Sequence, residues 1–211
     1  MRLTKLAMLL ALALVVMVPA SAAVIIDPYT DGQFNGFAGS GSFNYASVNV
    51  GLFNRVIGVT QTLATTGTAN TSILSSGGLL TLSVANNTDA DWVLTYTTGS
   101  PVDLSAMSSF LFSAASDLGY SLGFQVNGQN SSTSVLVPSG NVTGNFGVGF
   151  ASFAGVNWAN VTSIVISANG SKAASDLDLS PLVAGVPEPS TYALMGAGLL
   201  ALAGLARRRK A

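Results

Sequence analysis

Most of this chain alternates apolar residues with Ser, Thr or Asn, and that alternation constrains its fold more than any other feature. Seven segments between residues 78 and 170 show it: GLLTLSVAN, DWVLTYTTG, SSFLFSAAS, YSLGFQVNG, STSVLVPSG, GNFGVGFASF and VTSIVISANG. Gly, Asn, Asp or Pro interrupts the pattern about every 8 to 12 residues. Because a period of two places the apolar side chains on one face of a strand, the pattern predicts an all-β, antiparallel sandwich.

The segment that carries this pattern, residues 24–184, is long enough for one domain with a substantial core. Its nearest approach to a helix is a short turn around Pro101 to Met107. The chain contains no Cys and no His. Cys-His and Ser-His-Asp nucleophile systems and His-ligated zinc sites are therefore excluded, and a domain without disulfides must be held by its core.

The charge of this segment is negative, because eight Asp face only two cations, Arg55 and Lys172. An acidic surface disfavours anionic polymers unless a divalent cation bridges the two partners. We therefore expect no nucleic-acid partner.

The first 23 residues have the three parts of a secretory signal peptide. Arg2 and Lys5 form a positive region, Leu6 to Val18 form an apolar run, and Pro19 precedes the small residues Ala-Ser-Ala. The apolar run is short for a membrane span and the small residues follow at once, so we expect signal peptidase to remove residues 1–23. The alternative is an uncleaved anchor.

The last residues, 185–211, have the composition of a marginal membrane anchor. A helix over residues 190–206 would be about 26 Å long, slightly less than the hydrocarbon thickness of about 30 Å. The cations Arg207, Arg208, Arg209 and Lys210 follow it directly. By the positive-inside rule these cations stay in the cytoplasm, and the domain is exported through the inner membrane, with the helix as a transient anchor.

The order of Pro187-Glu188-Pro189, an apolar helix and an Arg cluster resembles the PEP-CTERM sorting signal of Gram-negative bacteria. The resemblance implies recognition of Pro187, Glu188 and Pro189 by an exosortase, a cut near them, and release to the cell surface or the medium. It also implies a setting in which exopolysaccharide and biofilm matrix are made. The alternative is a simple tail anchor with a Pro-rich hinge.

The body is similar to galactose-binding-like and carbohydrate-binding jelly rolls. The likeness rests on an opening VIIDPYTDGQF, a middle SPVDLSAMSSFLFSAASDLGYSLGFQVNG and a close NWANVTSIVISANGSKAASDLDLSPL. It implies an acidic residue on the first strand and an Asp-bearing last strand.

Four Asp residues are candidates for a structural calcium site, and no other cofactor is expected. Asp176 and Asp178 are two residues apart, so their side chains point to one face of a strand. First and last strands of jelly rolls are often neighbours, so Asp27 or Asp31 can meet that pair around Ca²⁺, which prefers oxygen ligands. The alternative is a set of edge charges that block strand pairing.

Asp89 and Asp91 have the same spacing and form a weaker candidate, because the neighbouring residues favour a turn. Trp92 and Trp158 are candidates for stacking on sugar rings. For both tryptophans, the alternative is a place in the core or at its edge.

Three functional hypotheses follow. The first is an exported surface or extracellular-matrix protein with a structural or adhesive role, and the second is a module that binds the cell's own polysaccharide. The third is a glycoside hydrolase that uses two Asp, which requires two carboxylates converging in a cleft. Since the sequence offers no second feature of such a cleft, we expect no enzyme.

Overall fold

The computed structural model describes residues 23–63, 70–86, 88–169 and 174–185. The predicted signal peptide and the predicted sorting segment lie outside these residues, except for Ala23 and Gly185. Among the described residues, no helix has the length and apolar character needed to cross a membrane. The compact unit that they form runs from Ala23 to Gly185.

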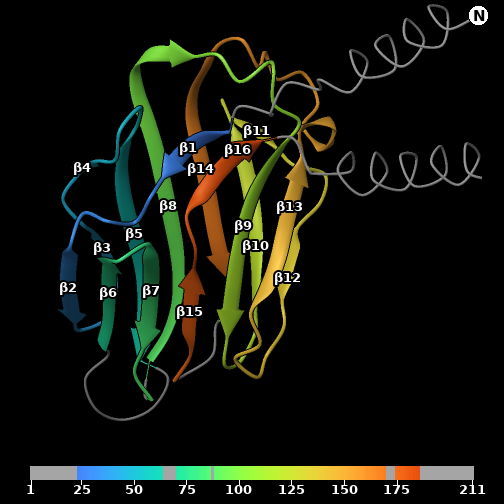
Figure 1. Ribbon diagram of the computed structural model, residues 1–211. Coiled ribbons are helices and arrows are strands. Elements are labelled where there is room, and N and C mark those ends of the chain that lie inside the picture. The colour runs from blue at the N-terminus through green and yellow to red at the C-terminus, as the bar shows by residue number, and fades with distance from the viewer. Residues whose placement is uncertain (1–22, 64–69, 87, 170–173, 186–211) are drawn as a thin grey trace, which may run out of the picture. The chain divides into compact units, whose positions relative to one another are not determined.

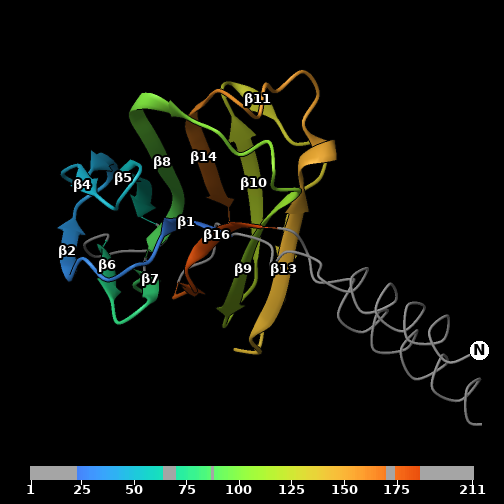
Figure 2. The same ribbon diagram turned by 45° about the horizontal axis from the view of Figure 1, so that its top comes forward.

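Two antiparallel sheets make up this unit (Figures 1 and 2). The first sheet contains, in spatial order, β1 (Val24–Asp27), β16 (Leu182–Gly185), β9 (Ser109–Ser116), β15 (Asp176–Leu179), β7 (Leu79–Val84), β6 (Asn70–Ser76) and β2 (Gln33–Ala38), with β13 (Gly144–Gly149) also paired to β9. The second contains β11 (Gln129–Asn130), β10 (Tyr120–Val126), β14 (Val161–Asn169), β8 (Thr88–Val102), β5 (Asn54–Leu63) and β3 (Gly41–Asn44), with β12 (Val135–Val137) on β10 and β4 (Val48–Asn49) on β5. The predicted all-β, jelly-roll-like sandwich is confirmed.

The two-residue alternation decides which side chains form the core. In β10, Leu122 and Phe124 are buried, whereas Gly123 and Gln125 between them lie on the outer face and are only half-buried. Every second residue is buried in the same way in β7, in β8 from Thr88 to Tyr96, in β9 from Phe110 and in β14 from Ile164. The outer face of the second sheet therefore carries mainly small or polar side chains, with the valines Val93 and Val165 among them.

The Asn127-Gly128 turn joins β10 to β11 with positive φ angles of 48° and 81°. These angles suit a tight hairpin turn, which Asn and Gly adopt most readily. The Asn127 Oδ1 atom accepts hydrogen bonds from the backbone N–H groups of Thr162 (2.9 Å) and Ser163 (3.1 Å). The turn is thereby attached to the start of β14.

Two details differ from the sequence-based expectation. The turn expected around Pro101 to Met107 begins later, because β8 continues through Val102. Within GNFGVGFASF, a 3₁₀ turn, η1 (Phe150–Ser152), follows β13 and ends the strand.

The first and last strands of the unit are neighbours, as the jelly-roll resemblance implies. Val24 pairs with Ala184 and Ile25 with Val183 in antiparallel register. The Gly185 carbonyl accepts a hydrogen bond of 3.1 Å from the Ser108 N–H. The chain therefore enters and leaves the domain at the same end of the same strand pair (Figure 1).

Candidate functional site

Asp27 and Asp31, two of the calcium candidates, are held by a buried arginine. The Arg55 Nη1 atom is 2.7 Å from Asp27 Oδ2, and its Nη2 atom is 2.8 Å from Asp31 Oδ2. Nη2 also donates to Gln33 Oε1 at 3.0 Å, and the Ser75 hydroxyl donates to Asp31. The guanidinium thus engages both of the carboxylates of which one was predicted to meet Asp176 and Asp178 around Ca²⁺.

Electrostatics keep Arg55 charged. Burial alone would lower its pKa, but the charge of Asp27 and the hydrogen bond to it raise the pKa above its ordinary value. For Asp31, burial opposes ionisation, yet the Ser75 hydroxyl and the charge of Arg55 hold the pKa of its carboxyl below the usual value. Burial raises the pKa of the Asp27 carboxyl, against the charge of Arg55, which lowers it. The cluster thus joins a sealed guanidinium to a buried carboxyl and to the partly exposed Asp31.

Asp176 and Asp178 lie elsewhere. They are on β15, which pairs with β7 and β9 and not with β1. Asp178 accepts a hydrogen bond of 2.6 Å from the Thr81 hydroxyl. Within the part of the chain that the structure describes, no three acidic, His or Cys residues are grouped so that they could hold a metal ion. Calcium binding at these residues therefore stays a prediction without a preformed cluster to support it.

Trp92 cannot present a face to a sugar ring, because its side chain has no solvent exposure. It lies on β8 between Val59 of β5 and Ala168 of β14. The predicted stacking role of Trp92 is therefore wrong in this structure, and its alternative, a place in the core, holds.

Trp158 is half-buried and packs against the core. Its ring stacks on Phe150 with centroids 3.6 Å apart and planes 3° from parallel, and it meets the Phe153 ring edge-on at 5.5 Å. One face of the indole is therefore covered by protein. Trp158 remains a candidate for glycan stacking only through the rest of its surface.

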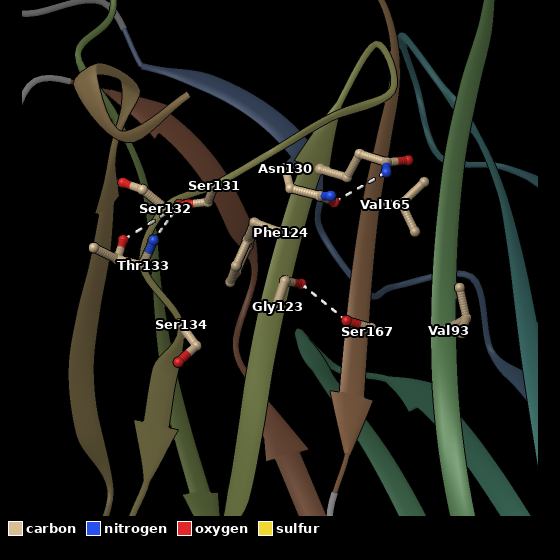
Figure 3. Close-up of a pocket in the computed structure, with 11 residues that line it drawn as sticks. Val93, Gly123, Phe124, Asn130, Ser131, Ser132, Thr133, Ser134, Val165 and Ser167 are labelled. Carbon is tan, nitrogen blue, oxygen red and sulfur yellow. Dashed lines mark hydrogen bonds between the residues drawn. The ribbon is translucent and has the colours of Figure 1, made fainter. Parts of the chain in front are cut away.

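A groove of about 510 Å³ lies on the outer face of the second sheet (Figure 3). Its floor comes from β8, β14 and β10, and one side is formed by the segment 130–134, which begins at the last residue of β11 (Figure 3). The lining residues are Val93, Gly123, Phe124, Gln125, Asn130, Ser131, Ser132, Thr133, Ser134, Val165 and Ser167. Five of these side chains carry hydroxyls and two carry amides, so the groove can both donate and accept hydrogen bonds.

The floor of the groove depends on a glycine in mid-strand. Gly123 lies opposite Ser167, and a Cβ atom at Gly123 would be 2.7 Å from the Ser167 Oγ atom. Ser167 in turn lies opposite Val93, whose side chain is 38% exposed. The absence of a side chain at Gly123 gives the floor its depth beside these two residues.

The wall of the groove, residues 130–134, is fixed at several points. Ser131 N–H donates to the Phe124 carbonyl at 2.8 Å, and the Ser132 N–H donates to the Ser152 carbonyl at 2.8 Å. The hydroxyls of Ser131 and Ser152 are 2.7 Å apart. On the floor side, Gln125 Nε2 donates to Asn130 Oδ1 at 3.1 Å. The wall is therefore tied to both β10 and the 3₁₀ turn η1.

Sequence reasoning did not identify this groove. Two signals in the chain point to it: a glycine within the strand YSLGFQV, and the run Asn-Ser-Ser-Thr-Ser after the Asn-Gly turn. A glycine within a strand often marks a place where another group approaches the backbone. Neither signal reveals that the hydroxyl run folds back beside β10.

Residues 185–210 match the PEP-CTERM protein-sorting motif, which confirms the resemblance of the C-terminal segment. The motif implies exosortase-processed export. No characterised protein matched the chain as a whole.

Several solved structures are similar to this chain at low sequence identity. The family 11 carbohydrate-binding module of a cellulosomal cellulase from Clostridium thermocellum is 15% identical, with a TM-score of 0.46 over 81% of this chain and 99% of that one. A family 29 carbohydrate-binding module complexed with mannohexaose is 7% identical, with a TM-score of 0.41 over 79% and 93%. PfGH50B is 13% identical, with a TM-score of 0.41 over 57% of this chain and 22% of that protein. These similarities concern the fold.

Proposed function

We propose that this chain is an exported, exosortase-processed surface or extracellular-matrix protein with an adhesive role, and that its domain holds a polysaccharide chain in the groove of the second sheet. The observation that carries the proposal is the lining of that groove, with five hydroxyls and two amides beside exposed or half-buried valines. Binding sites combine such polar groups with apolar surface that covers the body of the ligand.

A sugar chain matches this lining in both respects. Its hydroxyls can exchange hydrogen bonds with Ser132, Thr133 and Ser134, which are exposed on the wall. Its C–H faces can rest on Val93 and Val165 of the floor, where burying apolar area contributes about 25 cal/mol per Å². The wall is already anchored, so little conformational entropy has to be lost when a ligand binds.

The sorting motif supports the same role. Exosortase-processed export would place the domain outside the inner membrane, where polysaccharide is available as a partner. Processing would require signal peptidase at the start of the chain and exosortase near Pro187, Glu188 and Pro189.

The groove argues against the two-Asp hydrolase. Glycoside hydrolysis requires two carboxylates on opposite sides of the bond that is cut. The residues that line the groove include neither Asp nor Glu. Asp27 and Asp31 do lie near one another, but Asp27 is sealed inside the sandwich and both are engaged by Arg55.

Affinity electrophoresis in gels containing polysaccharide tests the binding proposal. We expect the wild-type protein to be retarded and Gly123→Val to migrate freely, because the new side chain would occupy the floor beside Ser167. Gly149→Val is the matched control, since a Cβ atom at Gly149 meets nothing within 4 Å and β13 belongs to the first sheet. Equal retardation of all three proteins would remove the groove from consideration as the binding site.

A further inference from the structure

Resting on the proposed glycan binding, we infer that the binding site extends beyond the groove, across β8 and β5 to Asn44 on β3, and that its ligand is a segment of several sugar units lying across the strands. Asn44 holds one part of this segment, and the wall of the groove, residues 130–134, holds the other. The inference follows from the side chains that the register of the second sheet places in two neighbouring rows.

The first row contains three residues of the groove and continues past them. Gly123 of β10 pairs with Ser167 of β14, and Ser167 pairs with Val93 of β8 (Figure 3). Val93 pairs in turn with Gly58 of β5, and Gly58 pairs with Asn44 of β3. Because paired residues on neighbouring strands point to the same face of a sheet, this row extends on the outer face from the groove to β3.

The second row lies beside the first and carries most of the apolar surface. Gln125 of β10 pairs with Val165 of β14, which pairs with Thr95 of β8. Thr95 then pairs with Val56 of β5, and all four side chains are half-buried. Together with Val93 of the first row, Val165 and Val56 form an apolar floor with amide and hydroxyl groups beside it. The floor of the groove therefore continues onto β5.

Asn44 ends the first row on the side opposite the wall. Asn44 is exposed, and its Oδ1 atom lies over Gly58, since a Cβ atom at Gly58 would be 2.8 Å from it. The carboxamide is thus placed on the outer face, where it can both donate and accept a hydrogen bond. At about 4.8 Å between neighbouring strands, β3 lies about 19 Å from β10, so a single sugar ring cannot reach both Asn44 and the wall.

The length of the ligand should therefore determine its affinity. A short ligand is confined to one side of the floor and contacts either the wall or Asn44. A longer ligand contacts both without losing translational and rotational freedom a second time, because its second contact forms within the same complex. Affinity should rise with the number of sugar units until both sides are reached.

The test compares oligosaccharides of two lengths, with the processed protein purified from cells. Affinity electrophoresis first shows which of three polymers binds: a β-glucan, a mannan or a galactan. The disaccharide and the hexasaccharide of each polymer that binds are then titrated by calorimetry. We expect the hexasaccharide to bind about tenfold more tightly than the disaccharide or better, because only the longer ligand reaches from the wall to Asn44.

A pair of variants tests the contact with Asn44. Asn44→Ala should weaken hexasaccharide binding about fivefold, as expected for the loss of one uncharged hydrogen bond, and should leave disaccharide binding unchanged. Asn35→Ala is the matched control, because Asn35 is also exposed on an edge strand but belongs to β2 of the first sheet. This variant should bind both ligands like the wild type. Since both side chains are exposed, neither replacement should alter the fold.

Each contrary result has a distinct meaning. Equal affinities for the two lengths would confine the site to the groove and overturn the inference while leaving glycan binding in place. Hexasaccharide binding that is unchanged in Asn44→Ala, or weakened equally in Asn35→Ala, would overturn the contact with Asn44. If none of the three polymers bound, the glycan-binding proposal would fail, and the extended site with it.

Discussion

The Arg55 guanidinium lies 2.7 Å from the Asp27 carboxylate, and both side chains are sealed from solvent. Asp27 ends β1 and Arg55 is on β5, so this ion pair connects the first sheet to the second. The Tyr29 N–H donates to the other Asp27 oxygen at 2.8 Å, and the Tyr29 ring lies 5.6 Å from the guanidinium carbon. The beginning of the domain is thereby fixed to its interior.

Removing one partner of this pair should be costly. Arg55→Met leaves Asp27 buried without a counter-charge, and breaking a buried pair in this way costs about 3 to 5 kcal/mol. We expect urea denaturation to show a loss of that size. Asp27→Asn combined with Arg55→Met should recover part of it, and a double variant as unstable as Arg55→Met alone would contradict the explanation.

The stability of the domain should depend on Asp31 at acid pH. Because its pKa is lower in the folded protein than in the unfolded chain, Asp31 stabilises the fold above its unfolded pKa of about 4, and this contribution is lost as pH falls through the folded pKa. The free-energy difference between the wild type and Asp31→Asn should therefore be largest near neutral pH and shrink below pH about 4. Denaturation curves measured across this range test the sign, and a difference that grows in acid would contradict it.

Calcium should leave the melting temperature unchanged if Arg55 blocks the position between Asp27 and Asp31. Thermal unfolding with added Ca²⁺ and with a chelator measures this directly. A clear rise in the melting temperature with Ca²⁺, absent in Asp176→Asn, would instead support calcium binding at Asp176 and Asp178, two of the four predicted ligands.

The two tryptophans should respond differently to a soluble quencher. Trp92 is fully buried, so the fluorescence of Trp158→Phe should resist acrylamide, whereas that of Trp92→Phe should be quenched because Trp158 is half-buried. A polysaccharide in the groove should leave the quenching of Trp158 unchanged, since Trp158 is not among the lining residues. Protection of Trp158 by the ligand would place sugar on the indole and revive its stacking role.

Processing should depend on Glu188. This residue is the only Glu in the chain and lies between two prolines of the matched motif. We expect Glu188→Ala to accumulate with its C-terminal segment intact, as measured by the intact mass of protein from the membrane fraction and from the medium. Protein from cells that lack an exosortase provides the reference mass of the uncut form. If the variant is processed like the wild type, Glu188 is not needed for recognition.

The alternation of apolar and polar residues was sufficient to predict the sandwich, because strand periodicity is a local property. Segments such as YSLGFQV and VTSIVISAN form β10 and β14 as expected. The groove was not predictable in the same way. It depends on which strands become neighbours and on the return of residues 130–134 along β10, and both are set by tertiary packing.

The contacts of the candidate Asp residues were also not predictable from the sequence, because they too depend on tertiary packing. The spacing of Asp176 and Asp178 correctly implies a shared strand, but spacing gives no information about Arg55, which is 28 residues from Asp27. A lone cation within a β pattern is usually assigned to a surface. Here the carboxylates of Asp27 and Asp31 make the burial of Arg55 possible, because they form ion pairs with its guanidinium.

The pairing of Val24 with Ala184 also determines how the domain responds to mechanical force. Because β1 and β16 are antiparallel neighbours, their outer ends leave the sheet together. A load that pulls those two ends apart would break the hydrogen bonds between the strands one after another, and would therefore meet little resistance.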